Sequence, residues 1–106
     1  MGLFGRSYSS IVAEYARLVS QNIPDDERKL NPKVLMNLSS GDEKAHRAKW
    51  KETMQHWKSD LIHLRDACTD YADKSLFRAD EERKISEIIT FCIDRTRVLN
   101  AALQQY

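Results

Sequence analysis

The chain has 106 residues, a formal net charge of +1, and 42% hydrophobic and 31% charged residues. This length is typical of one domain with a buried core, and the composition excludes collagen-like chains and chains too polar to fold. The near-neutral charge excludes a field over the whole molecule that would draw it to DNA or to an acidic membrane. A charged partner would therefore have to be recognised by a local patch.

The first predicted helix covers residues 7–22. Tyr8, Val12, Tyr15 and Val19 recur at helical spacing and form one apolar stripe. Pro24 ends this helix, because the residue before a proline is disfavoured in the α-helical region.

Residues 23–40 form the linker that follows. Within it, Asn31 and Pro32 are typical of a helix start, with Asn31 as the N-cap and the proline at the first helical position. We therefore expect a short extra helix near residues 32–38, and its apolar side chains need to be covered.

Two long helices are predicted, over residues 41–73 and 77–105. Ser40 and Glu43 have the spacing of a capping box at the start of the first. Each helix carries a seam of residues that alternate steps of four and three. The seam residues are Trp50, Met54, Trp57, Leu61, Leu64, Cys68 and Tyr71 in the first helix, and Ile85, Ile89, Cys92, Thr96, Leu99, Leu103 and Tyr106 in the second. Such a seam is stable only against another helix.

The connection between the two long helices is short, so they must run antiparallel. The predicted fold class is therefore all-α: a long antiparallel helical hairpin with the shorter N-terminal helix packed on it, as a three-helix bundle within one domain, residues 1–106. Two registers of the hairpin fit the seams. The one we favour places Cys68 opposite Ile85 and the turn between Leu76 and Phe77, whereas a slip of one heptad places Cys68 opposite Cys92.

The second long helix also carries a second apolar stripe, which one partner helix cannot cover. The stripe consists of Ile88, Phe91, Val98 and Ala102 and is interrupted by Arg95. The N-terminal helix is the natural cover, but at about 25 Å it is shorter than the hairpin. Either residues 30–38 cover the remainder, or part of the stripe is left open for a second copy of the chain in a homodimer.

No residue pattern predicts a catalytic, cofactor or metal site, and we expect a protein that is not an enzyme. His56 and His63 are one heptad apart, about 10 Å along a helix, which is too far to share a metal ion. Cys68 and Cys92 lie on the seams without a nearby histidine and are expected to fill the core. Two cysteines also make no disulfide framework, which favours an intracellular, cytoplasmic protein. No apolar run is long enough to span a membrane.

One acidic residue of the N-terminal helix, Glu14, has apolar neighbours. We expect Arg95 to form a structural ion pair with it, or else to reach Asp60 on the first long helix.

The most suggestive surface feature is a row of cations at Lys44, Lys51, Lys58 and Arg65, which recur every seven residues along one edge of the first seam. None has an acidic residue three or four positions further on, so the usual pairing within a helix is missing. Ile62 lies beside Lys58 and Arg65 at a position that should be exposed. Ile93 of the second long helix should emerge nearby.

These features favour a protein-binding module such as an adaptor, inhibitor, immunity protein or small assembly subunit. The predicted docking residues are Lys44, Lys51, Lys58, Ile62 and Arg65, and the partner would present an acidic, partly apolar surface. The alternative is a nucleic-acid-associated protein that uses the same cations, but the sequence has no groove-reading motif. A second alternative is that the lysine stems only cover the edge of the core.

Overall fold

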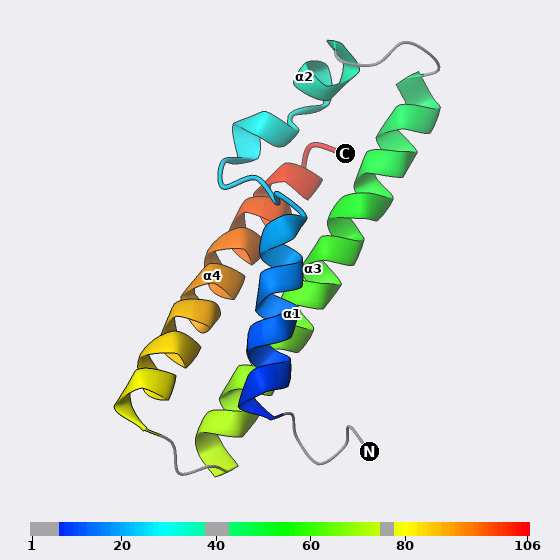
Figure 1. Ribbon diagram of the computed structural model, residues 1–106. Helices are drawn as coiled ribbons and strands as arrows, with labels where there is room; N and C mark the ends of the chain where they lie inside the picture. The colour runs from blue at the N-terminus through cyan, green and yellow to red at the C-terminus, as the bar shows by residue number, and fades with distance from the viewer. Residues whose placement is uncertain (1–6, 38–42, 75–77) are drawn as a thin grey trace.

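The computed structural model describes residues 7–37, 43–74 and 78–106, and its regular structure there is entirely helical. In chain order the elements are α1 (Tyr8–Ser20), the 3-10 helix η2 (Glu27–Leu30), α2 (Pro32–Asn37), α3 (Glu43–Lys74) and α4 (Ala79–Leu103). The predicted fold class is confirmed, because α1 packs on a long antiparallel hairpin of α3 and α4 (Figure 1). The molecule is elongated, measuring 51 × 26 × 21 Å along its principal axes. None of the described helices combines the length and the apolar character needed to cross a membrane.

Local signals set the helix ends close to the predicted positions. Ser7 caps α1 by accepting a hydrogen bond from the backbone N–H of Ser10 at 3.2 Å. The helix ends two residues earlier than predicted, before Asn22, which has a positive φ of 55°. The predicted cap of α2 is confirmed, since Asn31 Oδ1 accepts from the backbone N–H of Lys33 at 2.8 Å. The predicted capping residue Ser40 lies outside the described residues.

The two predicted seams form the core of the hairpin. Their fully buried members are Met54, Leu61, Leu64 and Cys68 on α3, and Ile85, Cys92 and Leu99 on α4. The bulkier members at the edges pack against this core but stay partly exposed. They are Trp50, Trp57, Tyr71, Ile89, Leu103 and Tyr106. Burying the seam residues removes most of their apolar surface from water, which is the main favourable term in forming the hairpin.

Contacts at both ends of the hairpin fix how α3 and α4 are paired. Near the turn, the Tyr71 hydroxyl donates to the Glu81 carboxylate at 3.2 Å. At the open end, the Arg47 guanidinium lies 5.7 Å from the centre of the Tyr106 ring. Both contacts fit the favoured register, whereas a slip of one heptad would separate each pair by about 10 Å. The turn residues themselves, 75–77, lie outside the described part of the chain.

Two elements, α1 and η2, cover the second apolar stripe of α4. Ile11 and Leu18 of α1 are fully buried, and the Tyr15 ring meets the Phe91 ring edge-on at 5.2 Å. Beyond the end of α1, Leu30 of η2 is buried, and its carbonyl oxygen accepts from the Tyr106 hydroxyl at 3.0 Å.

Residues 30–35 therefore cover the part of the stripe that α1 does not reach, as one of the two alternatives predicted. Ile88, Val98 and Ala102 are buried as a result. The stripe is not left open within the described chain, so a homodimer no longer follows from it.

Candidate functional site

The predicted docking residues lie along one edge of α3. We call Lys44, Lys51, Lys58 and Arg65 the basic edge. Because α3 is uninterrupted from Glu43 to Lys74, the seven-residue spacing keeps these four side chains in one row. Lys44 and Lys51 are exposed, whereas Lys58 and Arg65 are half-buried. Half-burial fits long stems that lie along apolar surface while their charged ends reach water.

The basic edge is less free of partners than the sequence predicts. Arg65 Nη2 lies 3.4 Å from Asp66 Oδ1, and Lys44 also interacts with another residue. The expectation that the whole row lacks compensation is therefore wrong for Arg65. Lys51 and Lys58, by contrast, form no ion pair with any residue that the structure describes. These two ammonium groups carry the uncompensated charge of this edge.

A shallow cavity adjoins one of the two unpaired lysines, Lys58. It has a volume of about 290 Å³ and is lined by Gln55, Lys58, Ser59, Ile62 and His63. Ile62 is half-buried rather than exposed as predicted. The cavity combines an aliphatic surface with an unpaired cation, which suits a partner side chain that is apolar next to an acid.

Ile62 lies on the side of α3 that is turned away from α1. On the α1 side, Arg17 Nη2 lies 3.0 Å from Asp60 Oδ2, and the rings of Tyr8 and Tyr71 are 6.2 Å apart. Ile62 follows Asp60 by two residues, which is about 200° of rotation around the helix. It therefore points to the opposite side of the hairpin.

The same relation holds on α4. Phe91 meets α1 through the ring of Tyr15, and Ile93 follows it by two residues. Ile93 is 53% exposed, as the sequence predicts. Ile62 and Ile93 thus lie on one face of the hairpin, which we call the distal face. Arg65 belongs to this face as well, since it follows Ile62 by three residues on the same helix.

Another cavity, of about 280 Å³, involves residues that the sequence placed in the core. Trp50 and Trp57 line it together with His46, Lys49 and Thr53. Both indoles pack against the core as predicted, yet both remain partly exposed. The reason is that α1 ends at Ser20 and does not extend along this part of α3 (Figure 1). In the sequence, the short predicted length of α1 indicated that the two indoles would be partly exposed, whereas their heptad spacing alone indicated burial.

The ion pair predicted for Glu14 is formed by a different cation. Arg17, three residues further along α1, bonds to both Glu14 and Asp60. Arg95 instead bonds to Asp94 at 2.7 Å. The prediction that Arg95 reaches Glu14 or Asp60 is therefore wrong, because Arg17 lies on the same face of α1 as Glu14 and is closer to both acids.

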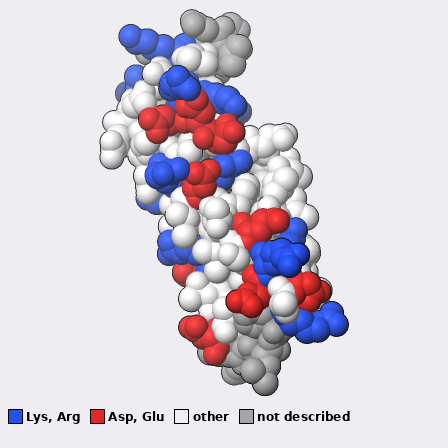
Figure 2. Space-filling model, turned by 90° about the vertical axis from the view of Figure 1, so that its left-hand side faces the viewer, with Lys and Arg blue, Asp and Glu red and all other residues white. Residues whose placement is uncertain are grey.

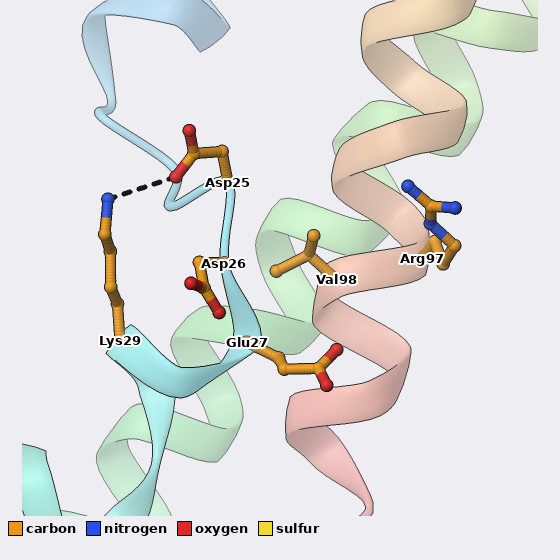
Figure 3. Close-up of a pocket in the computed structure, with 6 residues that line it drawn as sticks. All are labelled: Asp25, Asp26, Glu27, Lys29, Arg97 and Val98. Carbon is orange, nitrogen blue, oxygen red and sulfur yellow. Dashed lines mark hydrogen bonds and ion pairs between the residues drawn. The ribbon is translucent and has the colours of Figure 1, made fainter.

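A larger cleft, of about 610 Å³, lies between residues 25–29 and α4, where Val98 and Arg97 line its far side (Figure 3). Two of its three acids, Asp25 and Asp26, have local partners. Lys29 Nζ lies 3.0 Å from Asp25 Oδ1, and the Arg28 guanidinium lowers the pKa of Asp26 to about 2. On this side of the molecule Lys and Arg side chains alternate with Asp and Glu (Figure 2). The residues that line the cleft carry three negative and two positive charges, so the lining has only a small net negative charge.

The cysteines are buried and free, as predicted. Burial raises the pKa of the Cys68 thiol to about 11 and that of the Cys92 thiol to about 12, so neither forms the reactive thiolate near neutral pH. In the described ranges no three His, Cys, Asp or Glu side chains gather where they could hold a metal ion. Comparisons with protein-family models, with curated proteins and with solved structures found no match to this chain.

Proposed function

We propose that this protein is a non-enzymatic protein-binding module, in the class of adaptors, inhibitors, immunity proteins and small assembly subunits. The docking surface is the basic edge together with Ile62, on the outer side of α3. Its partner presents an acidic, partly apolar surface. The same proposal places the protein inside a cell, where two free thiols stay reduced.

The proposal is supported above all by Lys51 and Lys58, which lie one heptad apart without an ion pair within the described residues. A carboxylate from a partner can bind either ammonium group without first displacing an acid of this chain. Lys58 also lines the cavity beside Ile62, so charge recognition and apolar contact occur at the same place. Complementary charge of this kind mainly sets the rate and specificity of association, while the apolar contact slows dissociation.

The test is a pair of matched double variants. Lys58→Glu with Ile62→Asp reverses the charge and removes the apolar surface at the proposed site. Lys33→Glu with Val34→Asp makes the same two changes on α2, where Lys33 and Val34 are both exposed. Both variants should retain the helicity and thermal stability of the wild-type protein.

A partner retained by the wild-type protein is identified, purified and titrated against all three proteins. We expect the α3 variant to bind at least about tenfold more weakly and the α2 variant to bind like wild type. Equal affinity of all three proteins would refute the site. Unfolding of the α3 variant alone would show that Ile62 belongs to the core.

Nucleic acid is the competing ligand class, and salt distinguishes it. Binding to phosphates weakens linearly on a double-logarithmic plot against salt, with a slope close to the number of phosphates neutralised. Titration of labelled duplex and single-stranded DNA at low salt should show no binding. A steep salt-dependent affinity that Lys58→Glu abolishes would replace the proposed protein partner with a nucleic acid.

A further inference from the structure

The hairpin has two long faces, and the described residues outside the hairpin cover one of them. α1 occupies the first, through the Arg17–Asp60 ion pair on α3 and the Tyr15–Phe91 contact on α4. The distal face carries Ile62 from α3 and the exposed Ile93 from α4. The antiparallel pairing set by the end contacts of the hairpin places residues 62 and 93 within one helical turn of the same height.

Most of the α4 half of the distal face is neutral. The residues that share the side of Ile93 by helical spacing from Ser86 onward are Ser86, Ile89, Thr96, Asn100 and Leu103, and the acid that continues this spacing, Glu82, lies one turn earlier, close to the hairpin turn. Ile89, Thr96 and Leu103 are half-buried, so their outer surfaces form a shallow apolar strip beside the seam. The strip from Ile89 to Leu103 is about 21 Å long. In the pairing set by the end contacts, Glu82 is level with Tyr71, about 20 Å along the axis from Lys58, so no acid of α4 on this side lies opposite Lys51 or Lys58.

The shape and charge of this face restrict its occupant. A second copy packed face to face would bring two basic edges together, which costs free energy through like-charge repulsion. An extended peptide gains affinity from an open sheet edge, and the described surface is helical. Two antiparallel helices accept a third along their groove, and α1 already does so on the first face.

We infer that the distal face binds an acidic amphipathic helix of the partner, laid along both α3 and α4. Apolar residues at heptad spacing on that helix contact Ile62, Ile89 and Ile93, while its flanking carboxylates bind Lys51 and Lys58. The complex is a four-helix bundle in which the partner supplies the fourth helix. This inference rests on the proposed function and adds that α4 is half of the site.

The probe is a fluorescein-labelled synthetic peptide of about 21 residues, three heptads, with Leu at the a and d positions and Glu at e and g. Its glutamates repel one another across a dimer and keep the free peptide monomeric. A scrambled peptide of the same composition has the same charge without the apolar face. Binding is measured by fluorescence anisotropy and peptide helicity by circular dichroism.

The decisive variant is Ile93→Asn, which removes the apolar contribution of α4 without changing any charge. Its control is Val19→Asn on α1, since Val19 is similarly exposed, at 47% against 53%. We expect the ordered peptide to bind and gain helicity, with an affinity about tenfold weaker for Ile93→Asn and unchanged for Val19→Asn. The scrambled peptide should bind far more weakly.

Two results would overturn the inference. In the first, both peptides bind with equal affinity, and Lys58→Glu lowers that affinity while Ile93→Asn does not. The peptide carboxylates then bind α3 alone, so the proposed function stands but the binding of a helix across α3 and α4 is refuted. If the ordered peptide does not bind, the distal face does not bind a helix of this chemistry. In that case the natural partner's response to the α3 double variant decides separately whether the proposed function stands.

Discussion

Replacing Leu61 by alanine tests how α3 is rotated within the molecule. Leu61 has no exposed surface, whereas its neighbour Ile62 is half-buried on the distal face. Truncation of a fully buried leucine costs about 2–5 kcal/mol, because apolar burial is lost and a cavity remains. We expect about 3 kcal/mol here, which is a large part of the roughly 5–15 kcal/mol that stabilises a typical domain. At roughly 4 °C per kcal/mol, the Tm should fall by about 12 °C.

Ile62→Ala is the matched control, since it removes the same number of carbon atoms one residue away. It should cost less than about 1.5 kcal/mol, because part of the Ile62 side chain already contacts water. Urea unfolding followed by far-UV circular dichroism measures both free energies. The slope of the unfolding free energy against urea concentration should stay unchanged, since both variants expose nearly the same surface as the wild-type protein when they unfold. Equal costs at the two positions would contradict the rotation of α3 and with it the exposure of the proposed docking surface.

Two further predictions concern the core and the cover of the hairpin. The buried thiols of Cys68 and Cys92 have pKa values of about 11 and about 12, so the unfolded chain ionises them first. Stability should therefore fall between about pH 9 and pH 11, by about 2 kcal/mol for each thiol, and Cys92→Ala should lose part of this slope. Rapid reaction of the native thiols with a thiol reagent would contradict their burial. Tyr106→Phe removes the donor to the Leu30 carbonyl and should cost about 1 kcal/mol in the same urea assay, whereas no change would mean that water replaces the bond.

The hairpin can be predicted from the sequence because the apolar seam positions repeat at regular spacing within each long helix. Seven seam positions on each long helix agree on one rotation, so the exposure of Ile93 follows from the same spacing as the burial of Leu99. The register required a choice between two equal apolar patterns. Contacts outside the seams, such as Arg47 with Tyr106, distinguish them, and their geometry becomes visible only in the folded molecule.

The predictions that were wrong concern contacts between helices that are far apart in the sequence. Arg17 and Arg95 are both spaced to meet an acid, and only the packing of α1 on α3 decides that Arg17 does so. The half-burial of Trp57 likewise depends on where α1 ends. η2 is too short to show any helical period, so the sequence left the cover of this part of α4 open between residues 30–38 and a second copy of the chain.

The cover of the hairpin is divided at Asn22, the one non-glycine residue with a positive φ in the described chain. α1 protects the half of α4 near the turn, and η2 protects the half near the open end. Because separate pieces cover the two halves, each can detach while the other stays bound, and amide protons in the two halves of α4 can exchange with solvent through different opening events. Local unfolding near the C-terminus therefore does not require the ring contacts between α1 and the hairpin to break.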